Sequence, residues 1–157
     1  MIEASPQNVA VVVIGVLACI TDFRSRRIPN VLTFGASAAA IVFFGLTNGW
    51  AGSLWSLAGW AVGCGLFLPW FLLGGMGAGD VKLLAALGAW MGPVALLPIV
   101  LLSSVVGAII GGGLILLARR GREVPMPFGP YIAIAGWVWL VAGDKLLASY
   151  MSFAGLH

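Results

Sequence analysis

Long apolar runs without charge, separated by short polar or glycine-rich breaks, make up most of the chain. The runs cover residues 4–21, 31–46, 54–73, 83–117 and 131–141. A helix that crosses the hydrocarbon core of a bilayer needs about 20 mainly apolar residues. The first run has no basic segment before it and a basic cluster after it, so we expect a retained membrane helix and no cleaved signal peptide. The turn-rich residues 47–53 predict a loop between the second and third runs.

The composition agrees with this pattern. Hydrophobic residues make up 61% of the 157 residues and charged residues 8%, whereas a soluble domain carries about 25% charged residues. So few charges cannot cover a water-exposed surface, which excludes an ordinary soluble enzyme and a nucleic-acid-binding module. We therefore expect one membrane-embedded, all-α domain over residues 1–157, a polytopic bundle of about six transmembrane helices with the lipid bilayer as its main partner.

The basic residues predict the orientation of the helices, because short loops rich in Lys and Arg stay in the cytoplasm. If the run at 83–117 is split at Gly92-Pro93, the chain has six spans, and all basic residues but Lys145 fall on one side. Those on that side are Arg24, Arg26, Arg27, Lys82, Arg119, Arg120 and Arg122. This assignment puts both termini outside, and it makes the fourth span short for a full crossing.

Two carboxyl groups stand at the predicted cytoplasmic boundary. Asp22 ends the first span, and Asp80 begins the fourth, directly after the glycine run. Ionisable groups at membrane depth are costly and point to function. Two close carboxyls share one proton, so one can take a proton from water while the other donates to a carbonyl oxygen. The alternative is structural: Asp22 would cap the next segment or pair with Arg24 or Arg26, and Asp80 would cap the fourth helix.

The glycines around Asp80 favour a site. Gly74, Gly75, Gly77 and Gly79 crowd before this residue, and glycine lets a backbone bend sharply or approach another chain closely. A helix cap does not need four glycines, whereas a site that admits an extended peptide can use them.

Three segments together resemble the prepilin peptidases, a family of membrane aspartyl proteases with a G-x-G-D motif. Residues 77–82 read GAGDVK, residues 22–30 read DFRSRRIPN, and residues 127–130 read PFGP. The resemblance implies cleavage of the basic leader from type IV pilin and pseudopilin precursors, at the cytoplasmic face of the bacterial inner membrane. It implies that Asp22 and Asp80 are catalytic.

The resemblance also guides the remaining assignments. It makes Gly77, Gly79 and Lys82 candidates for substrate binding or for shaping the site. Cys19 and Cys64 form no C-x-x-C pair, so the chain resembles the short form without a methyltransferase domain, as in tight-adherence (Flp-type) pilus systems. We expect no metal, no cofactor and no nucleic-acid partner.

Other interpretations stay open at this stage. Lys82 could favour an ionised carboxylate, bind an acidic group of the substrate, or extend to the membrane surface. The carboxyls could also belong to a small proton- or ion-coupled transporter subunit, and the chain could be a non-catalytic assembly subunit. A transporter that relays protons would place its acids near the middle of the membrane. Asp22 and Asp80 instead flank basic loops at one boundary, which favours chemistry at the membrane surface. We further expect small residues such as Gly107, Gly111, Gly112 and Gly113 to let an apolar substrate segment pack closely.

Overall fold

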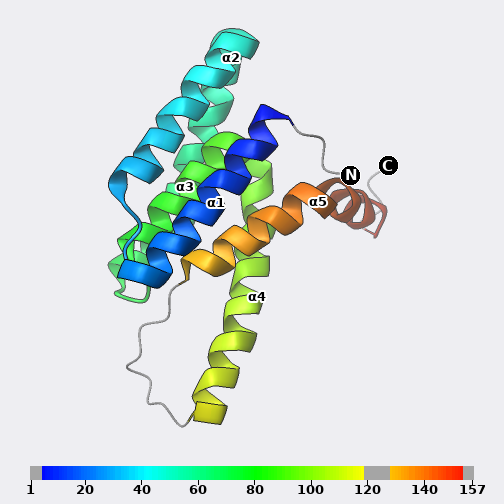
Figure 1. The fold of residues 1–157 in the computed structure, drawn as a ribbon. Coiled ribbons are helices and arrows are strands. Elements are labelled where there is room, and N and C mark those ends of the chain that lie inside the picture. The colour runs from blue at the N-terminus through cyan, green and yellow to red at the C-terminus, as the bar shows by residue number, and fades with distance from the viewer. Residues whose placement is uncertain (1–4, 119–127, 154–157) are drawn as a thin grey trace.

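The computed structural model describes residues 5–118 and 128–153, and all the regular secondary structure among these residues is helical (Figure 1). The helices are α1 (Pro6–Ser25), α2 (Asn30–Leu72), α3 (Ala78–Met91), α4 (Pro93–Ala118) and α5 (Gly129–Phe153). Helices are expected here because a bilayer offers no water to satisfy the backbone polar groups, which must bond within each segment. The all-α prediction is confirmed.

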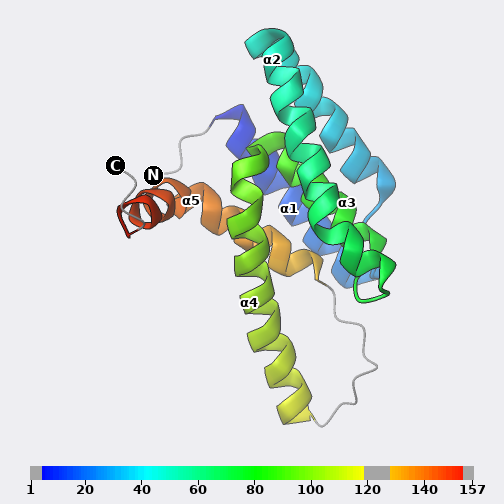
Figure 2. The same ribbon diagram turned by 180° about the vertical axis from the view of Figure 1, so that it is seen from behind.

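Helix α2 consists of two antiparallel legs joined at Gly49 (Figures 1 and 2). Gly49 has φ 66° and ψ −158°, a conformation open to glycine and rarely adopted by other residues. The legs approach closely at this turn, where Ser53 Oγ donates to the Ile41 carbonyl at 3.2 Å and a Cβ at Gly52 would collide with the Phe44 carbonyl. The predicted loop at residues 47–53 is therefore wrong: one glycine makes the reversal, and helix continues on both sides of it.

The predicted break at Gly92-Pro93 is confirmed. Helix α3 ends at Met91, Gly92 has φ 78° and donates its N–H to the Gly88 carbonyl at 2.8 Å, and Pro93 begins α4. Proline suits this position because the first residues of a helix have no partner for an N–H.

Three of the described helices are long and apolar enough to cross a membrane: α1, α2 and the Pro93–Ile110 part of α4. The apolar part of α5, Gly129–Gly143, is shorter, although the whole helix extends well beyond the predicted run at 131–141. The kink in α2 and the break before α4 divide the described chain into six helical segments, and the number of complete crossings stays a prediction.

Helix α3 lies at the centre of the bundle, which explains why a short segment is apolar on every side. Leu83, Leu84 and Leu87 have no exposed surface, as expected of a helix enclosed by others. Small residues let α2 reach it: Gly59 lies against the Gly88 carbonyl, and a Cβ at Gly63 would stand 2.7 Å from the Ala85 Cα.

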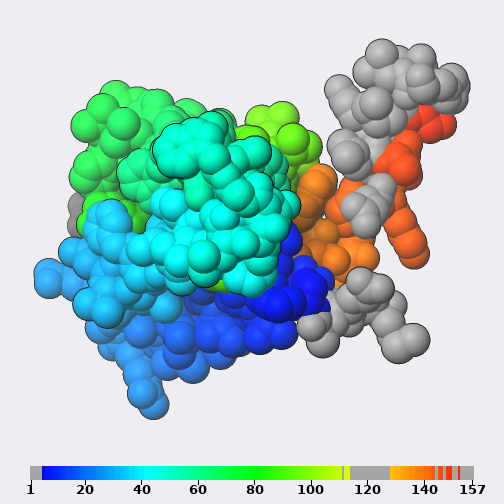
Figure 3. Space-filling model, turned by 90° about the horizontal axis from the view of Figure 1, so that it is seen from above, coloured from blue at the N-terminus to red at the C-terminus, as the bar shows by residue number. Residues whose placement is uncertain are grey.

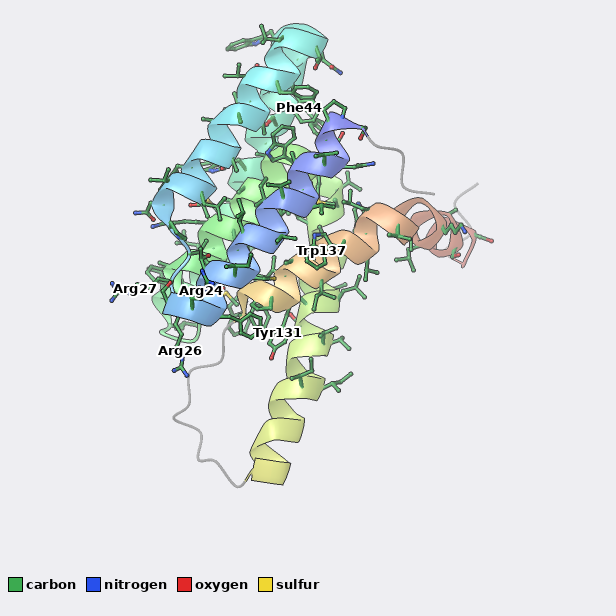
Figure 4. The ribbon with its side chains drawn as sticks, in the orientation of Figure 1. Arg24, Arg26, Arg27, Phe44, Tyr131 and Trp137 are labelled. Carbon is green, nitrogen blue, oxygen red and sulfur yellow. The ribbon has the colours of Figure 1, made fainter. Side chains whose placement is uncertain are left out.

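The two ends of the bundle differ. The α1–α2 and α2–α3 connections lie at one end, and the Gly49 kink lies at the other (Figures 1 and 2). Arg24, Arg26 and Arg27 lie at the first end, and Phe44 lies near the second (Figure 4). Seen along the bundle, the C-terminal half of α5 extends away from the other described helices (Figure 3).

Candidate active site

Asp22 lies in the last turn of α1 and is 6% exposed. The helix ends at Ser25, because Arg26 takes a left-handed conformation with φ 50° and donates its N–H to the Asp22 carbonyl at 2.9 Å. A left-handed residue at this position closes a helix by satisfying a terminal carbonyl. The chain then turns back so that Ile28 is buried and Pro29 precedes α2. These features hold the Asp22 side chain at one end of the bundle.

Asp80 lies in the first turn of α3 and is 9% exposed. The residue before the helix is Gly77, whose carbonyl accepts the Asp80 N–H at 3.1 Å and whose backbone also bonds the Asp80 carboxyl. A Cβ on Gly77 would stand 3.3 Å from Asp80 Oδ2. The sharp turn falls earlier, at Gly74 with φ 75°. The glycine run therefore brings the backbone close to the carboxyl of Asp80.

The structure brings Asp22 and Asp80 to the same cavity of about 470 Å³. The same cavity is lined by all three of the other candidates, Gly77, Gly79 and Lys82. Burial, together with the negative charge of Asp22, raises the pKa of Asp80 to about 7, against a smaller opposing effect of the Gly77 backbone. An acid of this kind, beside a second carboxyl, keeps its proton close to neutral pH.

The cavity also carries positive charge at its rim. Arg26 and Arg27 line it and are exposed, and they point away from the bundle (Figure 4). Within the described residues no salt bridge joins Asp22 or Asp80 to a basic side chain. The predicted alternative in which Asp22 pairs with Arg24 or Arg26 thus finds no support in the described geometry.

Lys82 contacts helix α2. Its Nζ donates to Asn30 Oδ1 at 2.9 Å and lies 5.6 Å from the centre of the Phe34 ring. The ammonium group therefore ties the first turns of α2 and α3 together, through a hydrogen bond and a cation–π contact.

Gly79 packs against the connection between α1 and α2. It lies inside the first turn of α3, and a Cβ there would stand 3.4 Å from the Cβ of Ile28. Its φ is not positive, so the reason for glycine here is close approach and not a left-handed turn.

Gly129 was not singled out as a site residue in the sequence, although it belongs to the PFGP segment. It is the first residue of α5, and a Cβ on it would stand 2.8 Å from Asp22 Oδ2. The Gly129 backbone amide interacts with the Asp22 carboxyl. Asp22 Oδ2 is nevertheless fully buried, and no described residue, Gly129 included, makes a hydrogen bond to this atom. A buried polar atom of this kind calls for an explanation.

The predicted glycine surface on α4 is not borne out at Gly107. A Cβ there would stand 2.8 Å from Phe128 Cε2 and 3.3 Å from Tyr131 Cδ2. The glycine therefore leaves space for the start of α5 and for Phe128, the residue before it. Gly112 and Gly113 have open space beside them. Gly111 lies among the positions whose side chains are outside the described set.

Among residues 5–118 and 128–153, no three His, Cys, Asp or Glu side chains lie close enough together to hold a metal ion. What the cavity does offer is a pair of buried carboxyls from separate helices, beside glycine backbone and near basic residues. The fold and the site together define an all-helical, multi-pass membrane protein with two acids at one end of its bundle.

The chain belongs to the type IV leader peptidase family, whose sequence model matches residues 9–112. It is 43% identical over 143 residues to a prepilin leader peptidase/N-methyltransferase of Xanthomonas campestris pathovar campestris, which covers 87% of this chain and 50% of the relative. Proteins of the same name in Aeromonas salmonicida and Pseudomonas aeruginosa are each 53% identical, over 62% and 52% of this chain and 34% and 28% of the relative. The chain thus spans half or less of the length of these relatives. No solved structure gives a significant match.

Proposed function

We propose that this protein is a membrane aspartyl endopeptidase that removes the leader peptide from type IV or Flp-type prepilins. The observation that carries the proposal is that Asp22 and Asp80, from separate helices, line one cavity at the basic end of the bundle. Membership in the leader peptidase family supports the choice of substrate. The relatives in Xanthomonas campestris and Aeromonas salmonicida, which are named prepilin leader peptidase/N-methyltransferase, support it as well.

The chemistry requires one proton shared by the two carboxyls. The ionised carboxylate takes a proton from a water molecule, whose oxygen attacks the scissile carbonyl carbon. The protonated carboxyl donates its proton to the carbonyl oxygen, which gives a tetrahedral intermediate. When the C–N bond breaks, the carboxyl that took a proton from water gives it to the leaving amine. One hydroxyl group of the intermediate returns its proton to the other carboxylate, so the pair again holds one proton. The raised pKa of Asp80 suits the acid role at neutral pH, and the unpaired Asp22 Oδ2 is a position that can hold a shared proton.

The proposed function also implies an orientation of the protein in the membrane. Six crossings would put the basic residues, and with them the cavity, at the cytoplasmic face of the bacterial inner membrane. The N-terminal end of α1 and the C-terminal end of α5 would lie outside. Helix α3 has 14 residues, about 21 Å at 1.5 Å per residue, so its crossing requires local thinning of the bilayer or enclosure by the surrounding helices.

The substrate would enter as a membrane-anchored helix whose cut site is unwound at the boundary, because helical hydrogen bonds hide the scissile carbonyl. Anionic lipid at the cytoplasmic surface would hold a basic leader near the cavity. An apolar segment packed against the bundle would supply most of the binding.

The test uses the full chain reconstituted in liposomes with a type IV prepilin from one of the organisms named above. We expect one cut between the leader and the apolar segment, identified by mass spectrometry of both products. A short soluble peptide that spans only the cut site should be cut poorly. An intact precursor after prolonged incubation, with the enzyme folded and inserted, would overturn the proposed function. Equal rates for the precursor and the short peptide would refute recognition of the apolar segment.

A further inference from the structure

A second, apolar cavity adjoins the carboxyl site. It has a volume of about 270 Å³ and lies between the two legs of α2 and helix α3. Its lining is Thr33, Phe34, Ser37, Trp60, Cys64, Leu68, Phe71, Ala78, Val81, Lys82 and Ala85. Two of these residues, Ala78 and Lys82, also line the carboxyl cavity, so the two spaces share a wall on the first turn of α3.

The apolar cavity extends from the carboxyl site along α3. Ala78, Val81, Lys82 and Ala85 follow the i, i+3, i+4, i+7 spacing of one helix face, and this face forms one wall of the cavity. Ala85 lies more than a turn beyond Asp80, in the direction of the buried core of α3. The cavity therefore begins beside the proposed acid and continues toward the apolar part of the bundle.

The cavity is open on one side. Thr33, Val81 and Ala85 are buried and form its base, whereas Phe34, Leu68 and Phe71 are each more than a third exposed. These exposed residues lie on α2, a helix apolar enough to span the bilayer. A group could therefore enter from the lipid side without first passing through water.

The polar residues in its wall do not make the cavity polar. Ser37 Oγ donates to the Thr33 carbonyl at 2.7 Å, and Thr33 Oγ1 donates to the Asn30 carbonyl at 3.3 Å. Both hydroxyl protons are thus used within α2. Lys82 directs its ammonium group to Asn30 Oδ1 and the Phe34 ring. Such a space prefers an apolar group, because a polar one would lose its hydrogen bonds to water without replacement.

We infer that this cavity is a specificity subsite that receives one bulky apolar side chain of the substrate, that of the residue directly after the scissile bond. The inference rests on the proposed function. A volume of about 270 Å³ is below the usual range of roughly 300–1,000 Å³ for pockets that hold drug-sized ligands, and it suits a single large side chain. A backbone with its scissile carbonyl between Asp22 and Asp80 would have its leader on the basic side and its apolar segment on the α3 side. The first side chain of the apolar segment, directly after the scissile bond, would then lie beside Ala78 and Lys82, which line both cavities.

The test combines a substrate series with one enzyme variant and its matched control. The precursors carry Phe, Leu, Ala, Gly or Asp directly after the cut site, and kcat/KM is measured for each with the reconstituted full chain. We expect Phe or Leu to be cut roughly tenfold or more faster than Gly, and Asp slowest. Cys64→Phe adds a ring inside the cavity, where Cys64 is part of the lining. Gly65→Phe adds the same ring at the next position, which has open space beside it.

Cys64→Phe should reverse the preference, so that the Ala precursor is cut faster than the Phe precursor, and Gly65→Phe should keep the wild-type order. A reversal of this kind cannot come from a damaged fold, which would lower all rates together. If the wild type cuts all five precursors alike, or if Cys64→Phe keeps the wild-type order, the subsite is overturned while the proposed function stands. If the wild type cuts no precursor, the proposed function fails and the subsite with it.

A cross-linking experiment covers the case in which Cys64→Phe is inactive on every precursor. A photoreactive benzoylphenylalanine replaces the residue after the cut site, and the Asp80→Asn enzyme holds the precursor without cleaving it. We expect cross-links to residues 33–37 and 60–68. Cross-links to α4 or α5, or to lipid alone, would place this side chain elsewhere and overturn the inference.

Discussion

Gly129, the first residue of α5, lies so close to Asp22 of α1 that a Cβ on it would stand 2.8 Å from Oδ2 of the carboxyl. The two residues are more than a hundred positions apart in the chain. The contact explains how Asp22 is buried at the end of its helix: the start of α5 covers it with backbone and leaves no room for a side chain.

This contact leads to a prediction for Gly129→Ala. The added methyl group would displace the Asp22 carboxyl, and a misplacement of about 1 Å in a reacting group can cost on the order of a hundredfold in rate. We expect kcat/KM for leader removal to fall by about that factor while the protein still inserts. Gly136→Ala is the matched control, because a Cβ there would stand at an ordinary 3.5 Å from Leu87 Cδ1. Equal activity of the two variants would contradict a positioning role for Gly129.

The carboxyl pair should act as a unit. We expect Asp22→Asn and Asp80→Asn each to lower cleavage by at least roughly a thousandfold, and the double variant to be no worse than either single one, because removal of one member already disables the unit. The readout is the fraction of precursor converted at fixed enzyme and time. Asp144→Asn makes the same chemical change at a residue of the C-terminal half of α5 and should be active. Normal cleavage by either single variant would end the assignment.

The pH dependence follows from Asp80. Because the pKa of Asp80 is raised to about 7, the pair keeps one proton below this pH and loses it above. The rate should therefore fall as pH rises through about 7, and should fall again at low pH, where both carboxyls are protonated. The measurement is kcat/KM against pH in liposomes, with samples returned to the optimum to exclude inactivation. A rate that still rises steadily above neutrality would show that the singly protonated pair is not the active form.

The activity should depend on the size of the side chain at position 79, because Gly79 packs closely against Ile28. A Cβ would stand 3.4 Å from Ile28 Cβ, a contact that a small shift can relieve, so Gly79→Ala should keep activity within about tenfold. Gly79→Val should press on Ile28 and abolish cleavage while the protein accumulates. The double variant with Ile28→Ala should recover part of the activity. If Gly79→Val cuts at the normal rate, the close approach has no functional weight.

The topology can be tested in a Cys19→Ser, Cys64→Ser background. We expect Ser5→Cys to react with an impermeant thiol reagent added from outside intact cells, and Arg122→Cys to react only after the membrane is opened. Equal labelling of both positions from outside would refute six crossings with the cavity at the cytoplasmic face.

Several features of the protein could be predicted from the sequence because they depend on local composition. Runs of apolar residues with 8% charge overall predict membrane helices, since a backbone in lipid must satisfy its own polar groups. Gly92-Pro93 predicts the break between α3 and α4, since a positive φ and a missing N–H are properties of those two residues. Asp22 and Asp80 stood out because charge in an apolar chain is costly.

The tertiary structure decided what depends on residues far apart in the chain. Residues 47–53 look like a loop by composition, and the packing of Gly52 on Phe44 makes them a tight helical turn at Gly49. Gly107, expected to face a substrate, instead admits Phe128 and Tyr131. The meeting of Asp22 with Gly129, and of Lys82 with Asn30, follows from the way the described helices pack. Composition and spacing do not determine such contacts, because many helix arrangements bury the same apolar faces and only the close approach of particular small residues selects one of them.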